Sequence, residues 1–392
     1  MKRVAIAGFG TVGQGIWQIL QEQRERLAHA LGQAPEVAAI LVRDIGRARD
    51  VAVPAGLLTD DPQRLLADGA VDVLLEATGD TALGYTLARQ AMARGVHVVT
   101  AGKALVSQYM EELSALAEEQ GVHFLYEASV AGGTPVIKPL KDLAMLGRVH
   151  TLRGIINGSC NHILSAMGGE GRAYDDVIAE ARALGYLEAD ADSDLLGWDA
   201  RRKLRILATL AMGGTVLEED IPCVGISRVT LADIRALGEK GYTVKLLGSA
   251  SRAEDRVAAS VFPWVLPHGD VLAAIGGAGN YVDIDAEYLG RVGFMGPGAG
   301  RLPTAHAMVN DLVDALLDRQ PRTSPLGSAR LVSLGGQQKA RFYLRGQGAD
   351  AFPTKQPLGP GWLTHLMPLA DVLAWLSQQP EACAIMVEAA SV

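Results

Sequence analysis

Residues 4–15 read VAIAGFGTVGQG, and this stretch decides the fold. The apolar run at 4–7 is typical of a buried strand, and Gly8, Gly10 and Gly13 follow it in the spacing GxGxxG, before a long helical pattern. Glycines at this spacing let the backbone approach a pyrophosphate, while the helix N-terminus supplies N–H donors and a partial positive charge. A tight glycine turn without a ligand is the alternative, but the strand–turn–helix context favours dinucleotide binding.

Strand and helix patterns alternate from this turn onward. Further strands are expected at 37–44, 72–80, 97–102 and 123–130, with helices between them. Because these runs are apolar throughout, they indicate a parallel sheet that is covered on both faces. The sequence therefore predicts an α/β fold that starts with a Rossmann-type dinucleotide-binding domain over residues 1–135, completed by a helix at about 304–318.

The pattern changes after this domain. Residues 136–303 are expected to form an α+β domain with a mostly antiparallel sheet, in which RGIINGSC (153–160) is a strand. A short C-terminal appendage is expected at 321–392. Its predicted elements are strands at ARFYLR (340–345) and ACAIMVEA (382–389) and a helix near 362–377.

The composition is that of an ordinary globular protein. The 392 residues are 49% hydrophobic and 20% charged, with a net charge of −8, which is enough chain for two or three domains. Without a basic block, nucleic acid is not an expected partner, and no apolar run reaches the roughly 18 residues of a membrane span. Cys160, Cys223 and Cys383 lie far apart with no CxxC, which argues against a zinc cluster or a disulfide framework and predicts a cytoplasmic protein.

Three charged residues at the carboxyl ends of strands bear on ligand binding. Arg43 would bind the 2′-phosphate of NADP, whereas Asp44 would bind the ribose hydroxyls of NAD, so both cofactors stay open. Lys103 follows a strand in TAGKAL, at the edge where ligands bind in open α/β sheets. It can neutralise a phosphate, hold a carboxylate or transfer a proton, or it is an ordinary surface lysine.

An acidic stretch, GYLEADADSDLLGWDARRK at 185–203, leads into an apolar helix. Asp199 and Lys203 are four residues apart, so they share one helix face, and Glu188 lies in the turn upstream. Two carboxylates and an amine at the start of such a helix suit a small zwitterion. An exposed i,i+4 ion pair, which is common and weakly stabilising, is the alternative.

Three further polar residues stand in apolar surroundings. Glu127, within the strand-like YEASV, is either a structural hydrogen-bonding residue or part of a cation site, because a buried carboxylate needs a partner. Cys160 and His162 are two apart on an expected strand and could face the same side. A buried structural cysteine is nevertheless favoured over a nucleophile, since no orienting group is evident.

Together these segments resemble the homoserine dehydrogenase family, in order and spacing, over residues 3 to about 316. The motifs that carry the resemblance are GFGTVG, the strand-end Arg43, HVVTAGKAL, YEASVAGGTPVIKPL, GIINGSCNHIL, LGYLEADADSDLLGWDARRK, YTVKLLGSA and GPGAGRLPTA. The chain departs from the family where Gly102 replaces the usual Asn and where Ala77-Thr78-Gly79-Asp80 replaces a Leu-Ile-Gly-Gly pattern. NGSCNH usually reads with two threonines and a tyrosine in the family, so Cys160 and His162 are unusual near the substrate.

The resemblance implies reversible, NAD(P)H-dependent reduction of aspartate 4-semialdehyde to L-homoserine, within threonine, methionine and isoleucine biosynthesis. It implies catalytic roles for Lys103 and Lys203, and substrate binding by Glu188, Asp199, Lys203, Gly158 and Ser159. The cofactor, NADP or NAD, would be bound by Gly8, Phe9, Gly10, Thr11, Val12, Gly13, Arg43, Thr78, Gly79, Lys103, Gly298 and Ala299. A monovalent cation, sodium or potassium, would be held by Glu127, Val130, Gly132 and Thr134, mostly through backbone carbonyls.

The resemblance also implies a homodimer, with residues 136–303 as the catalytic and dimerisation domain. The segment 321–392 resembles half of an ACT-type regulatory module, so we expect weak or absent inhibition by threonine. Two other functions stay open. One is a related NAD(P)-dependent dehydrogenase that acts on another amino or hydroxy acid, and the other is a non-catalytic NAD(P)-binding sensor.

Overall fold

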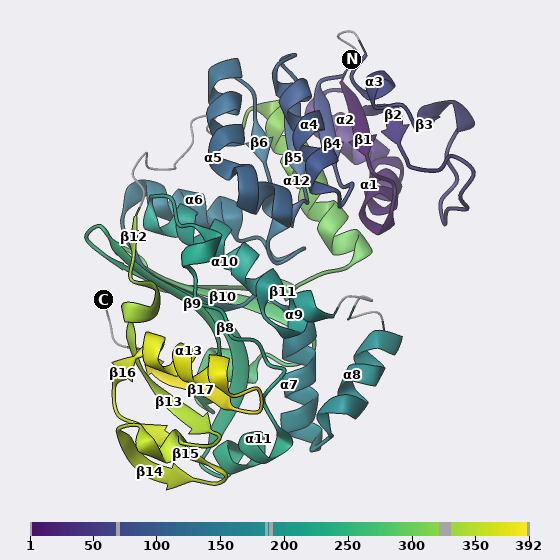
Figure 1. Cartoon of the computed structure of the whole chain (residues 1–392). Helices are drawn as coiled ribbons and strands as arrows, with labels where there is room; N and C mark the ends of the chain where they lie inside the picture. Colours follow the sequence, from purple (N-terminus) through teal and green to yellow (C-terminus); the bar gives the residue numbers. More distant parts are fainter. Residues whose placement is uncertain (1, 68–70, 185–186, 188–190, 321–330, 390–392) are drawn as a thin grey trace. The chain divides into compact units, whose positions relative to one another are not determined.

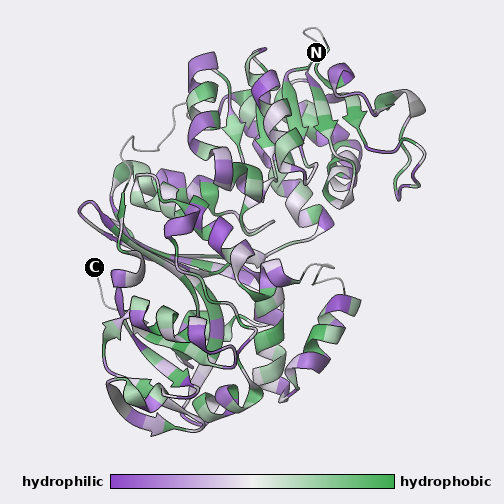
Figure 2. Ribbon diagram, viewed as in Figure 1, coloured by the Kyte–Doolittle hydropathy of each residue, from purple (hydrophilic) through white to green (hydrophobic). Residues whose placement is uncertain are grey.

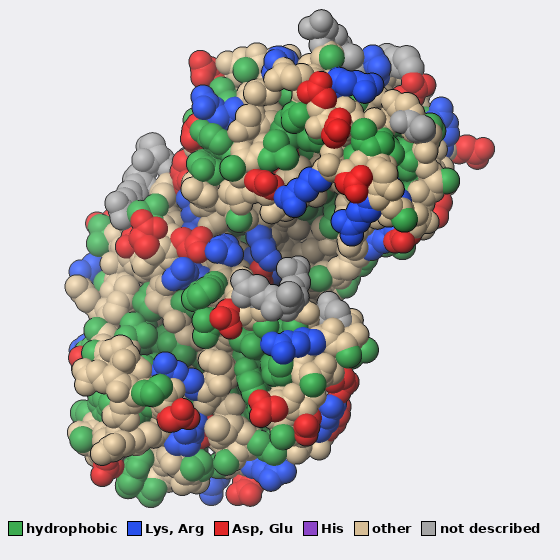
Figure 3. Space-filling model, turned by 45° about the vertical axis from the view of Figure 1, so that its right-hand side comes forward, with side chains coloured by type: hydrophobic (Ala, Val, Ile, Leu, Met, Phe, Trp, Pro, Cys, Tyr) green, Lys and Arg blue, Asp and Glu red, His purple; other side chains and the backbone are tan. Residues whose placement is uncertain are grey.

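The computed structural model describes residues 2–67, 71–184, 187, 191–320 and 331–389. The chain divides into two compact units (Figure 1). Unit 1 comprises Met1–Pro139 and Ala299–Gly327, and unit 2 comprises Leu140–Gly298 and Ser328–Val392. Within the described residues, no helix combines the length and apolarity that a membrane span needs. Acidic and basic side chains are interspersed over the face that Figure 3 shows.

Unit 1 is built on a six-stranded parallel sheet with the order β3-β2-β1-β4-β5-β6. Its strands are β1 (Arg3–Ala7), β2 (Glu36–Leu41), β3 (Leu58–Thr59), β4 (Val73–Glu76), β5 (His97–Thr100) and β6 (Phe124–Leu125). This is the strand order of a Rossmann fold, which confirms the predicted doubly wound sheet. The strands are hydrophobic along their length (Figure 2), because helices cover the sheet on both faces.

The helices of this unit include one that is distant in sequence. They are α1 (Thr11–Glu22), α2 (Arg24–Leu31), α3 (Pro62–Leu65), α4 (Thr81–Met92), α5 (Lys103–Gln120) and α12 (Arg301–Leu317), with 3₁₀ turns η1 (Ala55–Leu57) and η2 (Glu127–Ser129). Helix α6 (Ile137–Leu146) begins in this unit and continues into unit 2. A Cβ added at Gly15 of α1 would lie 2.7 Å from the carbonyl oxygen of Arg301. Helices α1 and α12 therefore meet backbone to backbone, and α12 belongs to this unit as the sequence predicts.

Several strands are shorter than predicted. The strand expected at 37–44 ends at Leu41, and the one expected at 72–80 ends at Glu76. The residues that follow form loops at the carboxyl edge of the sheet, where Arg43 and Thr78 lie. The strand expected at 123–130 stops at Leu125, so Glu127 lies in a 3₁₀ turn, and its placement in a strand was wrong.

Unit 2 holds a larger, mixed sheet with the order β11-β10-β7-β8-β9-β17-β13-β15-β14, and short strands β12 and β16 pair with β9 and β13. Most neighbours are antiparallel, as predicted, while β17 and β12 run parallel to β9. The strands are β7 (Val149–Ile155), β8 (Tyr242–Ala253), β9 (Arg256–Pro267), β10 (Gly279–Ala286), β11 (Gly290–Pro297), β12 (Val332–Ser333), β13 (Lys339–Arg345), β14 (Thr354–Leu358), β15 (Gly361–Thr364), β16 (Met367–Pro368) and β17 (Cys383–Ala389).

The helices of unit 2 correct one prediction near the substrate segment. They are α7 (Gly158–Glu170), α8 (Tyr174–Ala183), α9 (Asp192–Leu195), α10 (Trp198–Met212), α11 (Leu231–Gly238) and α13 (Leu369–Gln378), with 3₁₀ turns η3 (Glu218–Asp220), η4 (Val271–Ala274), η5 (Gly335–Gln337) and η6 (Ala349–Ala351). RGIINGSC was expected to be one strand, but β7 ends at Ile155 and α7 begins at Gly158. Asn157 explains the change, because its side chain accepts a hydrogen bond from the backbone N–H of Cys160 and caps the helix.

The C-terminal segment adds its strands to the sheet of unit 2. The helix expected near 362–377 was wrong at its start, because β15 and β16 occupy its first turns and α13 begins at Leu369. Pro368 is the N-cap residue of α13. Strand β13 pairs antiparallel with β17, and their apolar side chains pack on Phe262 of β9 in one buried cluster.

Candidate cofactor and substrate sites

The glycine turn between β1 and α1 leaves space beside a helix N-terminus. Gly8 has φ = +90°, and a Cβ there would clash with the backbone of Ala77. A Cβ at Gly13 would clash with the carbonyl oxygen of Gly8, whereas a Cβ at Gly10 would meet nothing within 4 Å. Gly10 is also the N-cap of α1, and no side chain caps that helix end. The turn is therefore suited to a pyrophosphate, which would take the N–H donors of the first helical turn.

The residues around this turn differ in exposure. Phe9 is buried in the core of the unit, while Thr11 is exposed and Val12 is half-buried. Gly298 and Ala299 lie in the turn between β11 and α12, one on each side of the boundary between the units. A Cβ at Gly298 would clash with the buried side chain of Asn280.

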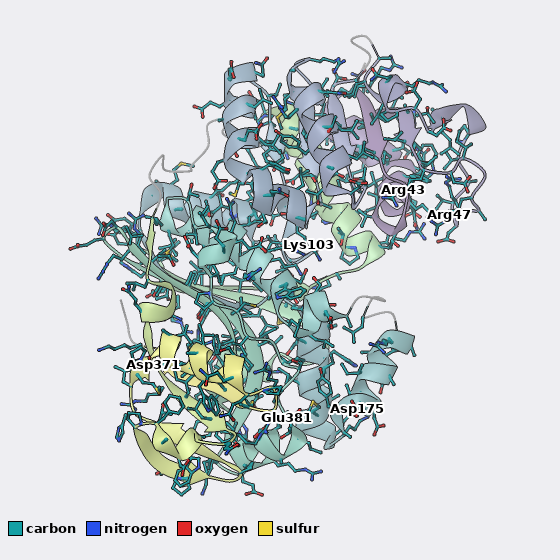
Figure 4. All side chains as sticks on the ribbon, in the orientation of Figure 1. Arg43, Arg47, Lys103, Asp175, Asp371 and Glu381 are labelled. Atoms are coloured by element: carbon teal, nitrogen blue, oxygen red, sulfur yellow. The ribbon has the colours of Figure 1, made fainter. Side chains whose placement is uncertain are left out.

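Arg43 lies just beyond β2, and its side chain is 82% exposed. Its Nη2 lies 3.5 Å from Oδ2 of Asp80. Asp44, the competing signal for NAD, accepts a hydrogen bond from the backbone N–H of Gly46. Figure 4 shows Arg43 at the end of β2 and Arg47 farther along the same loop. Arg43 is therefore available at the edge of the sheet where a nucleotide ribose would lie.

A buried carboxylate organises the next two turns of this edge. Glu76, at the end of β4, is 2% exposed and accepts hydrogen bonds from the backbone N–H and the hydroxyl of Thr78, at 2.8 and 2.6 Å. It also accepts one from the hydroxyl of Thr100, at 2.5 Å. The Thr100 hydroxyl in turn accepts from the N–H of Gly102, at 2.9 Å. Glu76 thus ties the turn after β4 to the turn after β5.

Lys103 follows Gly102 as the first residue of α5, at the carboxyl end of β5 (Figure 4). It is half-buried. A Cβ at Gly102 would lie 3.0 Å from Oε2 of Glu76 and 3.1 Å from Oγ1 of Thr100. The glycine at this position therefore fits the close approach of Glu76 and Thr100, and a larger side chain would have to displace them.

Glu127 accepts hydrogen bonds from the backbone at the start of α6, the helix that follows it. Its carboxylate accepts hydrogen bonds from the N–H groups of Val136, Ile137 and Lys138, at 2.6 to 2.8 Å, and so caps α6. Of the other residues expected at a cation site, Val130, Gly132 and Thr134 are buried. Ala131 and Gly132 have φ of 55° and 56°, so the backbone turns sharply between Val130 and Thr134.

Asp199 and Lys203 form a buried pair at the start of α10. Lys203 Nζ lies 2.7 Å from Asp199 Oδ2 and donates a hydrogen bond to the carbonyl oxygen of Ile156, at 3.0 Å. The Asp199 side chain is 2% exposed, so the interpretation as an ordinary exposed ion pair was wrong. Glu188, expected as the second carboxylate, lies outside the described residues.

Two residues of this site, Asn157 and Asp194, were not among the candidates predicted from the sequence. Asn157 donates from Nδ2 to Asp199 Oδ2, at 2.9 Å, and to Asp194 Oδ1, at 2.7 Å. The sequence offered one signal for Asn157, its position directly before Gly158 and Ser159, because Asn is a preferred N-cap residue and would mark the start of a helix there. Gly158 and the half-buried Ser159 form the first turn of α7, where a Cβ at Gly158 would lie 2.6 Å from the carbonyl oxygen of Ala278.

Cys160 is a structural thiol. Burial raises its pKa well above the ordinary value, and the carboxylates of Asp194 and Asp199 raise it further. Its Sγ donates to the carbonyl oxygen of Asp194. Because Cys160 and His162 lie on a helix rather than a strand, two residues apart they point to different faces. The predicted structural role fits better than a nucleophile.

Comparisons with known proteins agree with this geometry. Residues 135–313 match the family model described as homoserine dehydrogenase, and residues 8–127 match the model of the homoserine dehydrogenase NAD binding domain. The chain is 36% identical to a homoserine dehydrogenase from Synechocystis sp. over 385 residues, which cover 95% of this chain and 88% of the relative. The chain belongs to the homoserine dehydrogenase family. It is accordingly an oxidoreductase, as the sequence predicts.

Solved homoserine dehydrogenases have a similar fold over most or nearly all of this chain. The enzyme from Thiobacillus denitrificans superposes with a TM-score of 0.88 at 34% identity and covers 99% of this chain and 98% of its own. A hyperthermophilic archaeal homoserine dehydrogenase in complex with NADPH has a TM-score of 0.70 at 27% identity, covering 83% of this chain and all of its own. The matched NAD binding domain assigns a nicotinamide dinucleotide to unit 1 of this chain.

Proposed function

We propose that the protein catalyses the reversible reduction of aspartate 4-semialdehyde to L-homoserine, in the biosynthesis of threonine, methionine and isoleucine. The observation that carries the proposal is the buried Asp199–Lys203 pair with its Asn157 donor. A carboxylate and an ammonium group held side by side suit a substrate that carries an ammonium group, a carboxylate and a reacting oxygen. Substrate binding is assigned to unit 2 and dinucleotide binding to unit 1.

The substrate's ammonium group would be held by Asp199 and Glu188, with Gly158 and Ser159 lining the site. When bound, NAD(P)H supplies the hydride that reduces the aldehyde carbon, and the aldehyde oxygen takes up a proton. Lys103 and Lys203 are the groups that can deliver this proton and stabilise the negative charge that develops on the oxygen. Support comes from the position of Lys203 beside Asp199 and of Lys103 at the carboxyl edge of the parallel sheet.

The cofactor would lie across the turns at the carboxyl edge of unit 1. Its pyrophosphate would be bound by the turn from Gly8 to Gly13, and its remaining contacts are assigned to Arg43, Thr78, Gly79, Lys103, Gly298 and Ala299. The open space at Gly10 and the positive φ of Gly8 support the first assignment. The exposed guanidinium of Arg43 supports contact with the adenosine ribose.

A sodium or potassium ion is proposed beside Glu127, held by the carbonyl oxygens of Val130, Gly132 and Thr134. The sharp turn at Ala131 and Gly132 supports this, because the segment is buried and a tight backbone turn is a common way to direct carbonyl oxygens at a cation. Since the Glu127 carboxylate already caps α6, it would contribute negative charge rather than a dedicated ligand. Activity measured in sodium, potassium and choline chloride at equal ionic strength tests the ion, and equal rates in all three would contradict it.

A homodimer is proposed through unit 2. In the described part of the chain, β11 is an edge strand that pairs with β10, and Met295 on it is exposed, as are Tyr288 and Leu289 in the preceding turn. An exposed apolar edge strand readily pairs with another chain. Sedimentation equilibrium tests the dimer.

The free thiols of Cys160, Cys223 and Cys383 support a reducing, cytoplasmic location.

The experiment that tests the proposed function is an absorbance assay at 340 nm with L-homoserine and either NAD or NADP. We expect absorbance to rise with homoserine and not with L-serine or L-threonine. Turnover of another amino or hydroxy acid in preference to homoserine would favour a related dehydrogenase. Cofactor binding without turnover of any of these substrates would favour a sensor.

A further inference from the structure

Asp80 is a charged residue that the proposed function does not use. It stands after β4, where the sequence reads Ala77-Thr78-Gly79-Asp80. Its Oδ1 accepts a hydrogen bond from the N–H of Leu83, at 3.1 Å, so it caps α4. Its other oxygen, Oδ2, lies 3.5 Å from Nη2 of Arg43. The Asp80 side chain is 40% exposed, which leaves it open to solvent and to a ligand.

The strand order shows what this ion pair spans. Arg43 follows β2 and Asp80 follows β4, and β1 lies between these two strands in the sheet. The pair therefore bridges the carboxyl end of β1, next to the turn that begins at Gly8. In an open parallel sheet this crevice receives the nucleotide, and the end of the second strand receives the ribose hydroxyls or the 2′-phosphate.

We propose that Asp80 is a specificity-determining residue that disfavours NADP relative to NAD. This inference rests on the proposed function, because it concerns the cofactor of that same site. A 2′-phosphate would have to compete with Asp80 for the guanidinium of Arg43, and it would then lie close to the Asp80 carboxylate. NAD carries a neutral hydroxyl at that position, so neither penalty applies.

The other charged groups of this edge have partners of their own or add negative charge. Arg49 donates from its guanidinium to the carbonyl oxygens of Asp44, Ile45 and Arg47, so it is held within its own loop. Asp44 adds a second carboxylate to that loop. Arg301, at the start of α12, pairs with Asp50 of the same loop at 3.2 Å, so it is already held by a carboxylate. Arg43 pairs instead with Asp80 of the loop after β4.

The test is the variant Asp80→Asn, studied as the full chain. Asn is as good an N-cap residue as Asp, so the cap of α4 is kept while the charge is removed. Dissociation constants for NADPH and NADH are measured by fluorescence titration of the reduced nicotinamide. We expect the constant for NADPH to fall by about threefold to fivefold, the scale of one charge interaction at an exposed site, and that for NADH to change less than twofold. An unchanged ratio of the two constants, or an equal change in both, would overturn the inference.

A double variant, Arg43→Ala with Asp80→Asn, tests whether Asp80 acts through its ion pair with Arg43. In an Arg43→Ala background the Asp80→Asn substitution should give a smaller gain for NADPH, because there is no guanidinium to release. An equal gain in both backgrounds would show that Asp80 does not act through Arg43. If the unaltered chain binds neither NADH nor NADPH, the proposed function itself fails. If it binds both and the ratio does not respond, only the role of Asp80 fails.

Discussion

At the scale of single residues, burial decides what the ion pair of Asp199 and Lys203 means. Two exposed charges at this spacing contribute little, but Asp199 is 2% exposed and its Oδ2 is also bound by Asn157. A buried charge must keep its partners, because leaving it uncompensated is costly. The pair is therefore held in place before a substrate arrives, and a substrate ammonium group can share the same carboxylate.

The two proposed catalytic lysines can be tested by substitution. Lys203→Met and Lys103→Met should each lower kcat by about 100-fold or more, the effect of removing a positioned proton donor and a stabilising charge. Lys240→Met is the control, because Lys240 is exposed and should leave kcat unchanged. Steady-state assays with homoserine and circular dichroism measure activity and folding. A folded Lys203→Met or Lys103→Met enzyme with near-normal kcat would contradict the role of that lysine.

Glu76 is a second residue whose burial leads to a prediction. Its oxygens accept hydrogen bonds from the Thr78 N–H and hydroxyl and from the Thr100 hydroxyl. In Glu76→Gln one oxygen becomes an NH₂ group, so at least one donor loses its acceptor, and unfolding should become easier by about 1–3 kcal/mol. Glu118→Gln, at an exposed position, should change the stability by less than about 0.5 kcal/mol. Urea denaturation compares the two, and equal stabilities would mean that the network contributes nothing.

At the scale of elements, Lys245 joins three parts of unit 2. This lysine of β8 is 2% exposed, and its Nζ donates to Asn161 Oδ1 and Ser165 Oγ on α7 and to the carbonyl oxygen of Ile275 after η4. The bonds hold α7, whose first turn carries Gly158 and Ser159. Burial away from water lowers the pKa of Lys245 from its ordinary value of 10.5 to about 8.

This lowered pKa predicts how stability depends on pH. Below about pH 8 the lysine is charged in both the folded and unfolded states, and the folded state bears the desolvation cost. Between about 8 and 10.5 it is neutral when folded and still protonated when unfolded, so the free energy of unfolding should rise with pH. The Lys245→Met variant has no titrating group at this position, so its free energy of unfolding should lack this rise with pH. Urea midpoints from pH 7 to 10 should therefore increase for the unaltered chain relative to Lys245→Met, while Lys240→Met should follow the unaltered chain. Parallel curves for all three would contradict the lowered pKa.

At the scale of the whole molecule, the C-terminal segment is part of the sheet of unit 2. Met386 of β17 pairs in parallel with Trp264 of β9, and buried Phe342 packs on Phe262. Asp233 of α11 is bound by the Tyr343 hydroxyl and by Arg345 Nε, which anchors β13 to the same unit. A segment tied to the sheet in this way stabilises it.

This attachment bears on regulation. An allosteric response needs two states that a ligand can bias by roughly 1–3 kcal/mol, and a segment continuous with the sheet has little freedom to provide them. We therefore expect no inhibition at sub-millimolar threonine. The test is a threonine titration of the full chain in the 340 nm assay, with L-serine as a matched amino acid. Inhibition by threonine that serine does not reproduce would show that an effector site exists.

The order of elements and the identity of the glycine turn could be predicted from the sequence, because both depend on local patterns. Apolar runs broken by GxGxxG specify strand, turn and helix within a few residues of chain, and the motifs from Gly8 to Ala305 identify the family. The same holds for Asp199 and Lys203, whose spacing places them on one helix face.

What the tertiary structure alone decided concerns residues whose partners are distant in sequence. Asn157 reaches Asp199, Glu76 reaches Thr100, and Arg43 reaches Asp80, and no local pattern marks these pairs. The start of α13 was misjudged because residues 361–368 are drawn into strands by pairing with β13 and β14, which outweighs their helical pattern. Burial and long-range pairing depend on how the whole chain packs, so a local pattern cannot tell a buried ion pair such as Asp199–Lys203 from an exposed one.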